Sequence, residues 1–292
     1  MARTFMTSIP AASGGEAKVI FSRNNPLIKR LRALQSREMR DRTGLHFVDG
    51  IRFVMQAIAH HAPIHSLLVS PELLTNPFGQ RLVRQQRRAG VSCLRVPPEV
   101  YHSVSLAEEP QGLAAVVPQR WETLETITPR ADLCWVALDL VQSPGNLGTL
   151  LRTSEAVGAA GVILIGESVD PYDPAVTRAS MGALFGQRFV RTGLEEFAAW
   201  KCRENVLLVG TSPTACQDYQ GTCYPAPVVL FMGGERQGLS QPCQALCDVV
   251  VKIPMVGQSD SLNLGVATSL MLYEVFNQTR RGPHTAGFGP LR

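Results

Sequence analysis

The sequence predicts an α/β protein of two domains, and three observations support this prediction. Short apolar runs typical of strands alternate with segments of helical periodicity along most of the 292 residues. The alternation is interrupted by the weakly periodic segment PQRWETLETITPR (118–130), which has prolines near both ends. The apolar runs after this segment are continuous in Val, Ile and Leu, which is typical of a parallel sheet covered on both faces.

The domain organisation follows from these segments. We expect a flexible N-terminus at residues 1–16, a small α/β domain at 17–118, a linker at 119–132, a parallel-sheet domain at 133–280 and a flexible C-terminus at 281–292. In the small domain the expected helices are 25–42, 50–59 and 80–89, and the expected strands are 45–49, 64–69, 91–96 and 113–117. In the larger domain the expected strands are 133–140, 161–165, 186–190, 206–211, 228–232 and 249–253, and the expected helices are 147–157, 174–184, 194–204 and 262–278.

Charge is distributed unevenly between the two halves. Residues 1–132 hold 17 Lys and Arg against 11 Asp and Glu, whereas residues 133–292 hold 11 against 13. A basic first half indicates a polyanionic partner, and the alternative is a solvated basic surface with no partner. The near-neutral second half indicates a site for a small ligand.

Composition excludes several classes of protein. With 45% apolar and 18% charged residues, the chain is not disordered, collagen-like or a coiled coil. It has no apolar window of about 18 residues and no apolar leader, so we expect a cytoplasmic protein without a membrane partner. Seven cysteines without a C-x-x-C pair indicate reduced, buried thiols, with a zinc site or a disulfide framework as the less favoured alternatives.

Three loops of the second half mix glycine with polar residues directly after a predicted strand. They are SPGNLGTLLR (143–152), FMGGERQGLS (231–240) and IPMVGQSDSLNLGVA (253–267). Ligands of open α/β sheets bind beyond the carboxyl ends of the strands, so these loops are expected to converge on one crevice. Neither a G-x-G-x-x-G fingerprint after the first strand nor a Walker A sequence is present, which disfavours nicotinamide and ATP chemistry.

The loops also carry a family resemblance. In order and spacing, NLGTLLR (146–152), GERQG (234–238) and SLNLGVATSLMLYE (261–274) resemble the three motifs of the SpoU/TrmH family of RNA ribose 2′-O-methyltransferases, of the SPOUT class. The segments VTRASMGALF (176–185) and FVDGIRFV (47–54) are also similar to that family. The chain departs from the usual pattern at Gly265, where serine is common, and at Asp49, where glutamate is usual.

The resemblance implies a fold and a cofactor. The larger domain would be a SPOUT domain with a C-terminal trefoil knot, and the small domain would bind the RNA substrate. S-adenosylmethionine would be held by backbone groups of the knot loops. The residues expected to bind it are Thr211, Gly233, Gly234, Gly238, Ile253, Ser261 and Leu262. Glycine suits these loops because backbone approaches an adenosine closely only where no Cβ intervenes.

The resemblance also implies catalytic residues. Arg152 would act at the ribose hydroxyl and its phosphate, with an ion pair to Glu155 or Glu235 as the alternative interpretation. The other catalytic candidates are Asn146, Glu235, Ser261 and Asn263. A homodimer is implied, with Arg178 and Ser180 placed to complete the partner's site, and no metal site is implied.

The RNA contacts are predicted from the basic first half. Six arginines are the candidates for phosphate contacts, namely Arg37, Arg40, Arg42, Arg84, Arg87 and Arg88. The favoured substrate is large-subunit ribosomal RNA, with tRNA as the alternative substrate. A catalytically silent RNA-binding or ribosome-assembly protein and a different small-molecule enzyme are the alternative functions.

The last helix is predicted from one apolar stripe. We expect Leu262, Val266, Leu270 and Tyr273 to face the core, and Ser261 to cap the N-terminus of the helix.

Overall fold

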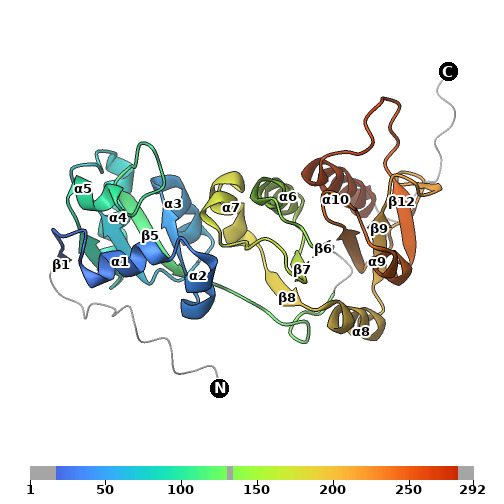
Figure 1. Cartoon of the computed structure of the whole chain (residues 1–292), viewed down its shortest axis with the longest axis horizontal. Coiled ribbons are helices and arrows are strands. Elements are labelled where there is room, and N and C mark those ends of the chain that lie inside the picture. The colour runs from blue at the N-terminus through green and yellow to red at the C-terminus, as the bar shows by residue number, and fades with distance from the viewer. Residues whose placement is uncertain (1–17, 130–133, 282–292) are drawn as a thin grey trace. The chain divides into compact units, whose positions relative to one another are not determined.

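The computed structural model describes residues 18–129 and 134–281 (Figure 1). The predicted flexible ends and the last residues of the predicted linker lie outside this range, except that the C-terminal helix includes Arg281. The described chain divides into two compact units. The first consists of residues up to 119 together with 170–185, and the second of residues 120–169 together with those from 186 onward.

The first unit is built on a mixed sheet whose strands lie in the order β1-β4-β3-β5-β2. Strand β5 is antiparallel to both β2 and β3, and the other neighbouring pairs are parallel. The strands are β1 (Lys18–Val19), β2 (Leu45–Asp49), β3 (Ser66–Val69), β4 (Ser92–Arg95) and β5 (Leu113–Pro118). The helices before residue 119 are α1 (Pro26–Ala33), α2 (Arg37–Thr43), α3 (Ile51–Ala59), α4 (Pro77–Arg88) and α5 (Pro98–His102).

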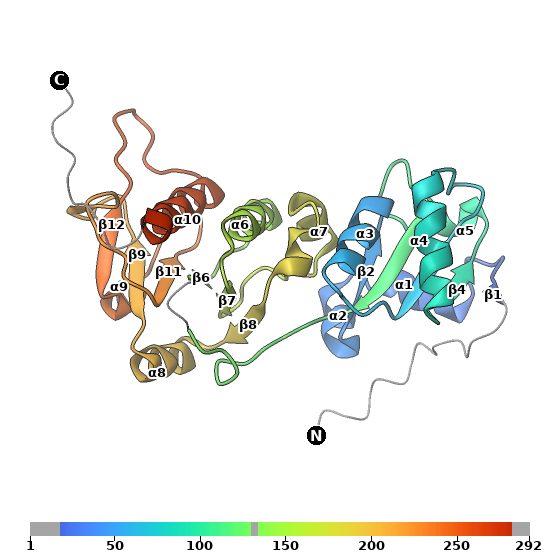
Figure 2. The same ribbon diagram turned by 180° about the vertical axis from the view of Figure 1, so that it is seen from behind.

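Helices cover both faces of this sheet. The apolar residues of α1 and α5 share one core cluster with residues of β2, β3, β4 and β5. Figure 2 shows α3 and α4 on the opposite side. The single helix expected at 25–42 is two helices, because Ser36 caps a new helix by accepting a hydrogen bond from the Met39 N–H. Strand β1 and helix α5 were not predicted.

The second unit contains the predicted parallel sheet, in the order β10-β12-β9-β11-β6-β7-β8. All neighbouring strands are parallel, and the prediction of a parallel α/β domain is confirmed. The strands are β6 (Trp135–Asp139), β7 (Gly161–Ile165), β8 (Phe189–Thr192), β9 (Leu207–Thr211), β10 (Gln217–Asp218), β11 (Val228–Met232) and β12 (Val249–Lys252). The helices are α6 (Pro144–Val157), α8 (Leu194–Glu204), α9 (Gln241–Leu246) and α10 (Leu264–Arg281).

The segment expected to be a linker packs against the second unit from residue 120 to residue 129. The Glu122 N–H donates to the Phe189 carbonyl at 2.8 Å, beside the edge strand β8. Leu124 and Ile127 are buried in the same core cluster as Trp135. The apolar residues of the segment therefore belong to the core of the second unit, which the low periodicity of the segment did not indicate.

Residues 170–185 follow β7 in the chain but pack in the first unit. They comprise helix α7 (Pro174–Ala179) and a short 3-10 turn (Ala183–Gly186) in place of the longer helix that was predicted. The guanidinium of Arg40, 1% exposed, anchors this segment: its Nε donates to Asp170 at 2.7 Å and its Nη2 to Asp173 at 3.1 Å. Its Nη1 donates to two backbone carbonyls of the α1–α2 connection. The expectation that Arg40 contacts RNA phosphate is therefore wrong, because its donors are occupied inside the protein.

Helix α10 presents a different face to the core than the one predicted. Val266, Leu270 and Tyr273 are 46%, 37% and 47% exposed. The buried face is that of Gly265, Thr268 and Leu272, and it packs against α6, where a Cβ on Gly265 would lie 3.1 Å from Thr149 Cβ. The lack of a side chain at Gly265 allows the two helices to approach closely at this point, and the large buried apolar residues of α10 are Met271, Leu272 and Val275 rather than the predicted ones.

The buried Arg40 cluster leads to a prediction about stability. We expect Arg40→Ala to lower the free energy of unfolding by about 3–5 kcal/mol, because it leaves the buried carboxylate of Asp170 without its cation. The measurement is urea unfolding followed by circular dichroism. The matched control is Arg42→Ala, which removes an exposed arginine of the same helix and is expected to change the free energy by less than about 0.5 kcal/mol. Equal effects of the two substitutions would contradict the assignment.

Candidate active site

The first motif forms the start of helix α6 directly after strand β6. The Ser143 hydroxyl accepts a hydrogen bond from the Asn146 N–H at 3.3 Å, and Pro144 takes the first helical position, where no N–H is needed. The helix consequently begins at Pro144, three residues before the predicted start. This capping places the side chain of Asn146 in the first turn, beside the loop that follows β11.

The Glu235 carboxylate joins the second motif to the first. It accepts hydrogen bonds from the Ser143 N–H at 2.9 Å, the Gln142 N–H at 3.2 Å and the Asn146 side-chain amide at 3.0 Å. The third motif attaches to the same group, because the Asn263 amide donates to Asn146 Oδ1 at 2.8 Å. Three of the predicted catalytic residues thus form one connected network that links the three motifs.

The ionisation of Glu235 reflects this network. Partial burial acts to raise the pKa of the carboxyl, but the hydrogen bonds from Asn146 and from the Ser143 and Gln142 N–H groups together outweigh it, so the net pKa is lowered. A carboxyl with a lowered pKa stabilises the folded loop above its ordinary pKa. That contribution is lost as the pH falls through the lowered value.

Two glycines allow the second motif to fold back on itself. A Cβ at Gly233 would overlap the backbone of Gly238 and Leu239, so only glycine fits there. Gly238 has a φ of +64° and its N–H donates to the Gly234 carbonyl at 2.9 Å. This tight turn holds Glu235 towards the start of α6.

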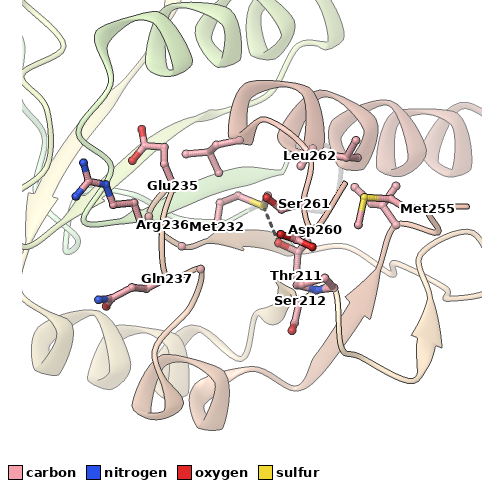
Figure 3. A pocket seen from close by; sticks show the side chains of 17 residues that line it. Thr211, Ser212, Met232, Glu235, Arg236, Gln237, Met255, Asp260, Ser261 and Leu262 are labelled. Atoms are coloured by element: carbon pink, nitrogen blue, oxygen red, sulfur yellow. Dashed lines mark hydrogen bonds between the residues drawn. The ribbon is translucent and has the colours of Figure 1, made fainter. Parts of the chain in front are cut away.

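A cavity of about 310 Å³ lies between the ends of β9, β11 and β12 and the start of α10. Its lining includes all of the residues predicted to bind the cofactor, namely Thr211, Gly233, Gly234, Gly238, Ile253, Ser261 and Leu262 (Figure 3). Further lining residues that the prediction missed include Met232, Met255 and Asp260. Met232 is the last residue of β11, and Met255 and Asp260 lie in the third glycine loop. Their positions in the sequence, close to the predicted residues, could have identified them as cavity residues.

The chemistry of this cavity suits a nucleoside with a charged tail. Met232, Ile253 and Leu262 provide apolar surface, and the backbone of the glycine turn lies at the wall without intervening side chains. Asp260 and Glu235 add carboxylates. The volume lies in the range of about 300–1,000 Å³ that is usual for small-molecule sites.

Other predicted residues lie outside this cavity. Asn263 is beside it, and it is the Asn263 side chain, not that of Ser261, that caps α10 by accepting from the Val266 N–H. Arg152 is exposed on α6. Among the described residues it forms no ion pair with Glu155 or Glu235, so the structure does not support the alternative ion-pair interpretation.

The remaining candidates lie in the first unit. Arg84, Arg87 and Arg88 are exposed on α4, which has no acidic residue. Arg42 is exposed on α2, while Arg37 pairs with Asp41 at 3.6 Å. Arg178 is exposed on α7. Ser180 is completely buried and donates to the Thr177 carbonyl, so it is not available to a partner's site.

Comparisons with known proteins identify the family. Residues 134–273 match the SpoU rRNA Methylase family, and residues 25–115 match the MRM3-like substrate binding domain. The chain is 32% identical to the 23S rRNA (uridine(2479)-2'-O)-methyltransferase of Streptomyces viridochromogenes over 93% of its own length and 98% of that protein. The chain belongs to the SpoU rRNA methylase family.

Solved structures of this family have the same fold. An AdoMet-bound rRNA methyltransferase from Sinorhizobium meliloti superposes with a TM-score of 0.82 at 33% identity, covering 93% of this chain and 100% of that one. The SpoU methyltransferase AviRb from Streptomyces viridochromogenes, in complex with AdoMet, has a TM-score of 0.80 at 31% identity, with 89% and 100% coverage.

The described residues include neither a cluster of metal-ligating side chains nor a helix that could span a membrane. Within residues 18–129 and 134–281, no three His, Cys, Asp or Glu side chains are grouped so that they could hold a metal ion. No helix in the same ranges has the length and apolar character needed to cross a membrane.

The network around Glu235 leads to a prediction about its titration. We expect Asn146→Ala to move the pKa of Glu235 back towards its ordinary value, because it removes the side-chain hydrogen bond that favours the carboxylate. Carboxyl ¹³C NMR during a pH titration measures this. Asn263→Ala is the matched control, since it leaves all three donors to Glu235 in place. A pKa that moves equally in both variants would contradict the direct role of Asn146.

Proposed function

We propose that the protein transfers a methyl group from S-adenosylmethionine to a ribose 2′-hydroxyl of large-subunit ribosomal RNA. The observation that carries the proposal is the Glu235–Asn146–Asn263 network, which joins three family motifs beside a cavity of nucleoside size. The similarity over nearly the whole chain to a 23S rRNA ribose methyltransferase supports the substrate class. A second relative, the 23S rRNA (guanosine(2553)-2'-O)-methyltransferase RlmP of Bacillus subtilis, is 26% identical over 88% of this chain.

The cavity residues fit the cofactor. Apolar side chains such as Met232 and Leu262 suit the adenine ring, and the backbone of the glycine turn suits its polar edge. The carboxylate of Asp260 suits a cationic group of the cofactor. When bound, the cofactor supplies an electrophilic methyl group on a sulfonium.

Arg152 is the proposed catalytic residue for the RNA side of the reaction. A guanidinium stays protonated in proteins, so Arg152 would not take the hydroxyl proton. It would bind the phosphate of the target nucleotide through two N–H groups and stabilise negative charge that develops on the ribose oxygen. Its exposure and its lack of an ion pair with the nearby glutamates leave its donors available for RNA.

The substitution Arg152→Ala tests this role. We expect methyl transfer to fall by roughly 100-fold or more, the scale for one preorganised charge-stabilising group, while S-adenosylmethionine binding stays close to normal. Arg152→Lys should rescue poorly, because an ammonium cannot reproduce the planar fork. Single-turnover transfer of a radiolabelled methyl group and isothermal titration with the cofactor are the measurements, and Arg203→Ala on α8 is the control.

Three further results would overturn parts of this proposal. Near-normal transfer by the lysine variant would show that charge alone is needed at residue 152. Lack of S-adenosylmethionine binding by the intact chain would favour a non-catalytic RNA-binding protein. Mapping of 2′-O-methyl groups in cells with and without the gene identifies the substrate, and a change confined to tRNA would replace the ribosomal assignment.

The proposed division of labour assigns RNA binding to the first unit. Helix α4 supports this, because its arginines at 84, 87 and 88 are exposed and the helix contains no acidic residue. Such a surface attracts phosphates largely independently of sequence. Arg42 belongs to the same proposal, and Arg37 is a weaker candidate because Asp41 already pairs with it.

A homodimer is part of the proposal. The exposed residues Val266, Leu270 and Tyr273 form an apolar stripe on α10 that a second copy of the chain would cover. A trefoil knot at the C-terminal end of the sheet and a cytoplasmic location are proposed as well. Support for the knot comes from the family resemblance and from the packing of α10 against α6 and β11.

If the apolar stripe is the dimer interface, a charge placed in it should weaken the dimer. We expect Leu270→Glu to raise the dissociation constant of the dimer by roughly 30-fold or more, as for a central interface residue. Light scattering after size-exclusion chromatography measures the mass in solution. Thr279→Glu, at an exposed position of the same helix, is the control. If both variants have the mass of the wild type, the stripe is not the interface.

A further inference from the structure

A second, much smaller cavity lies in the first unit. It has a volume of about 20 Å³, and it is formed where α7 packs beside β2 and α3. We call it the Asp49 notch. Its lining residues are Gln35, Phe47, Asp49, Phe53, Leu106, Pro174, Thr177 and Arg178. None of them belongs to the 310 Å³ cavity of the second unit.

The floor of the notch carries an oriented carboxylate. The Tyr101 hydroxyl donates to Asp49 Oδ1 at 2.7 Å, and the Ser105 hydroxyl donates to Asp49 Oδ2. Each oxygen of a carboxylate can accept a further hydrogen bond, so the group keeps acceptor capacity towards the notch. Burial raises the pKa of Asp49, while the hydrogen bonds from Ser105 and Tyr101 oppose that effect.

The rim of the notch combines apolar surface with a cation. Leu106 is 52% exposed and Phe53 is partly exposed. Arg178 is exposed, and within the described ranges its guanidinium forms no salt bridge. Its positive charge acts to lower the pKa of Asp49. A carboxylate, an apolar rim and a guanidinium therefore lie within one small site.

The notch is held in shape by the packing of residues 170–185. The ion pairs of the buried Arg40 guanidinium with Asp170 and Asp173 fix the start of α7. At the other end of the segment, Gly182 lies so close to α3 that a Cβ would come within 2.9 Å of the Gln56 side chain. Arg178 is therefore presented from a segment that is fixed at both ends.

The size of the notch limits what can enter it. A volume of about 20 Å³ admits a group the size of one water molecule, so a nucleobase ring cannot enter. An exocyclic amino group has that size and donates hydrogen bonds, which a carboxylate accepts. The ring itself would then lie across Leu106 and Phe53 at the rim, where Phe53 offers the aromatic surface on which unpaired RNA bases stack.

We propose that the Asp49 notch binds one unpaired nucleotide of the RNA substrate whose base carries an exocyclic amino group. Asp49 accepts a hydrogen bond from the amino group, Leu106 and Phe53 contact the ring, and Arg178 binds the phosphate. Adenine, cytosine and guanine fit this description, whereas uracil presents a carbonyl oxygen instead. The inference rests on the proposed function for its RNA partner, and it adds a base-selective subsite in the first unit.

The substitution Asp49→Asn gives a test in which electrostatics and the proposal predict opposite results. Removal of a negative charge from a protein that binds a polyanion should strengthen binding or leave it unchanged. The proposal predicts weaker binding, because the substitution replaces one of the two acceptor oxygens with an NH2 group, which cannot accept from the amino group of the base, and removes the charge that strengthens the hydrogen bond to the other. An asparagine can still accept from Tyr101 and donate to the Ser105 oxygen, so the fold should be retained, which thermal unfolding checks.

The binding experiment uses the full chain with short fluorescent oligoadenylate, oligocytidylate and oligouridylate, measured by fluorescence anisotropy. We expect the wild type to prefer the amino-bearing oligonucleotides over oligouridylate by roughly tenfold, and Asp49→Asn to lose that preference. Arg178→Ala should weaken binding to all three oligonucleotides. It should also reduce the slope of log K against log salt concentration by about 1, as expected for the loss of one phosphate contact. Arg52→Ala is the matched control, an exposed arginine of α3 that does not line the notch; it should leave the base preference unchanged.

The outcomes separate this inference from the proposed function. An unchanged base preference in Asp49→Asn, or no preference in the wild type, would overturn the notch assignment even if methyl transfer to ribosomal RNA is normal. A lost preference in Asp49→Asn together with a retained one in Arg52→Ala would support it, and this readout needs no methyl transfer. Absence of ribosomal RNA methylation would instead count against the proposed function.

Discussion

The geometry of the catalytic domain depends on the Glu235 carboxylate. Loops that follow two neighbouring parallel strands, β6 and β11, carry the first two motifs, and a loop on its own has no fixed position relative to the next. Glu235 supplies that position, because it accepts two backbone N–H groups at the start of α6 and the amide of Asn146. Asn146 in turn accepts from Asn263, so the third motif is tied to the same carboxylate. Charge-assisted hydrogen bonds of this kind are among the stronger polar interactions of proteins.

The glycines of the second motif have a related purpose. Glu235 can reach α6 only if the turn that carries it is tight, and the turn is tight because Gly233 lies against the backbone of Gly238 and Leu239. The same lack of side chains leaves backbone at the wall of the cavity. One short sequence, GGERQG (233–238), therefore determines both the position of the carboxylate and the surface offered to a ligand.

Features set by local sequence were predictable, and features set by distant contacts were not. The parallel sheet follows from continuous apolar runs, and the cavity residues follow from loops at the carboxyl ends of strands, where parallel topology brings them together. The role of Arg40 depends on Asp170, 130 residues away, and nothing in an arginine-rich helix distinguishes the one arginine that is buried. Helix α10 is apolar on more than one side, so periodicity alone did not show that the Gly265 side, rather than the Val266 side, packs against α6. The segment that contains Leu124 and Ile127 was predicted to be a linker because it lacks periodicity, but a segment without periodicity can still place two residues in a core.

Because Arg40 binds Asp170, the family boundaries in the sequence differ from the boundaries of the packed units. The family match of residues 134–273 treats 170–185 as part of the methylase sequence, whereas packing assigns this segment to the first unit. The chain consequently passes between the two units three times, near residues 119, 169 and 185. A fragment that begins after residue 118 would leave Asp170 without its cation, and would expose Tyr172 and Phe185, which pack around His46. Each exposed aromatic side chain costs roughly 1.5–3 kcal/mol of lost burial, so such a fragment lacks part of the core on which its own sequence depends. The substrate-binding and methylase sequences are therefore interdependent in folding, because a segment of the second completes the structure of the first.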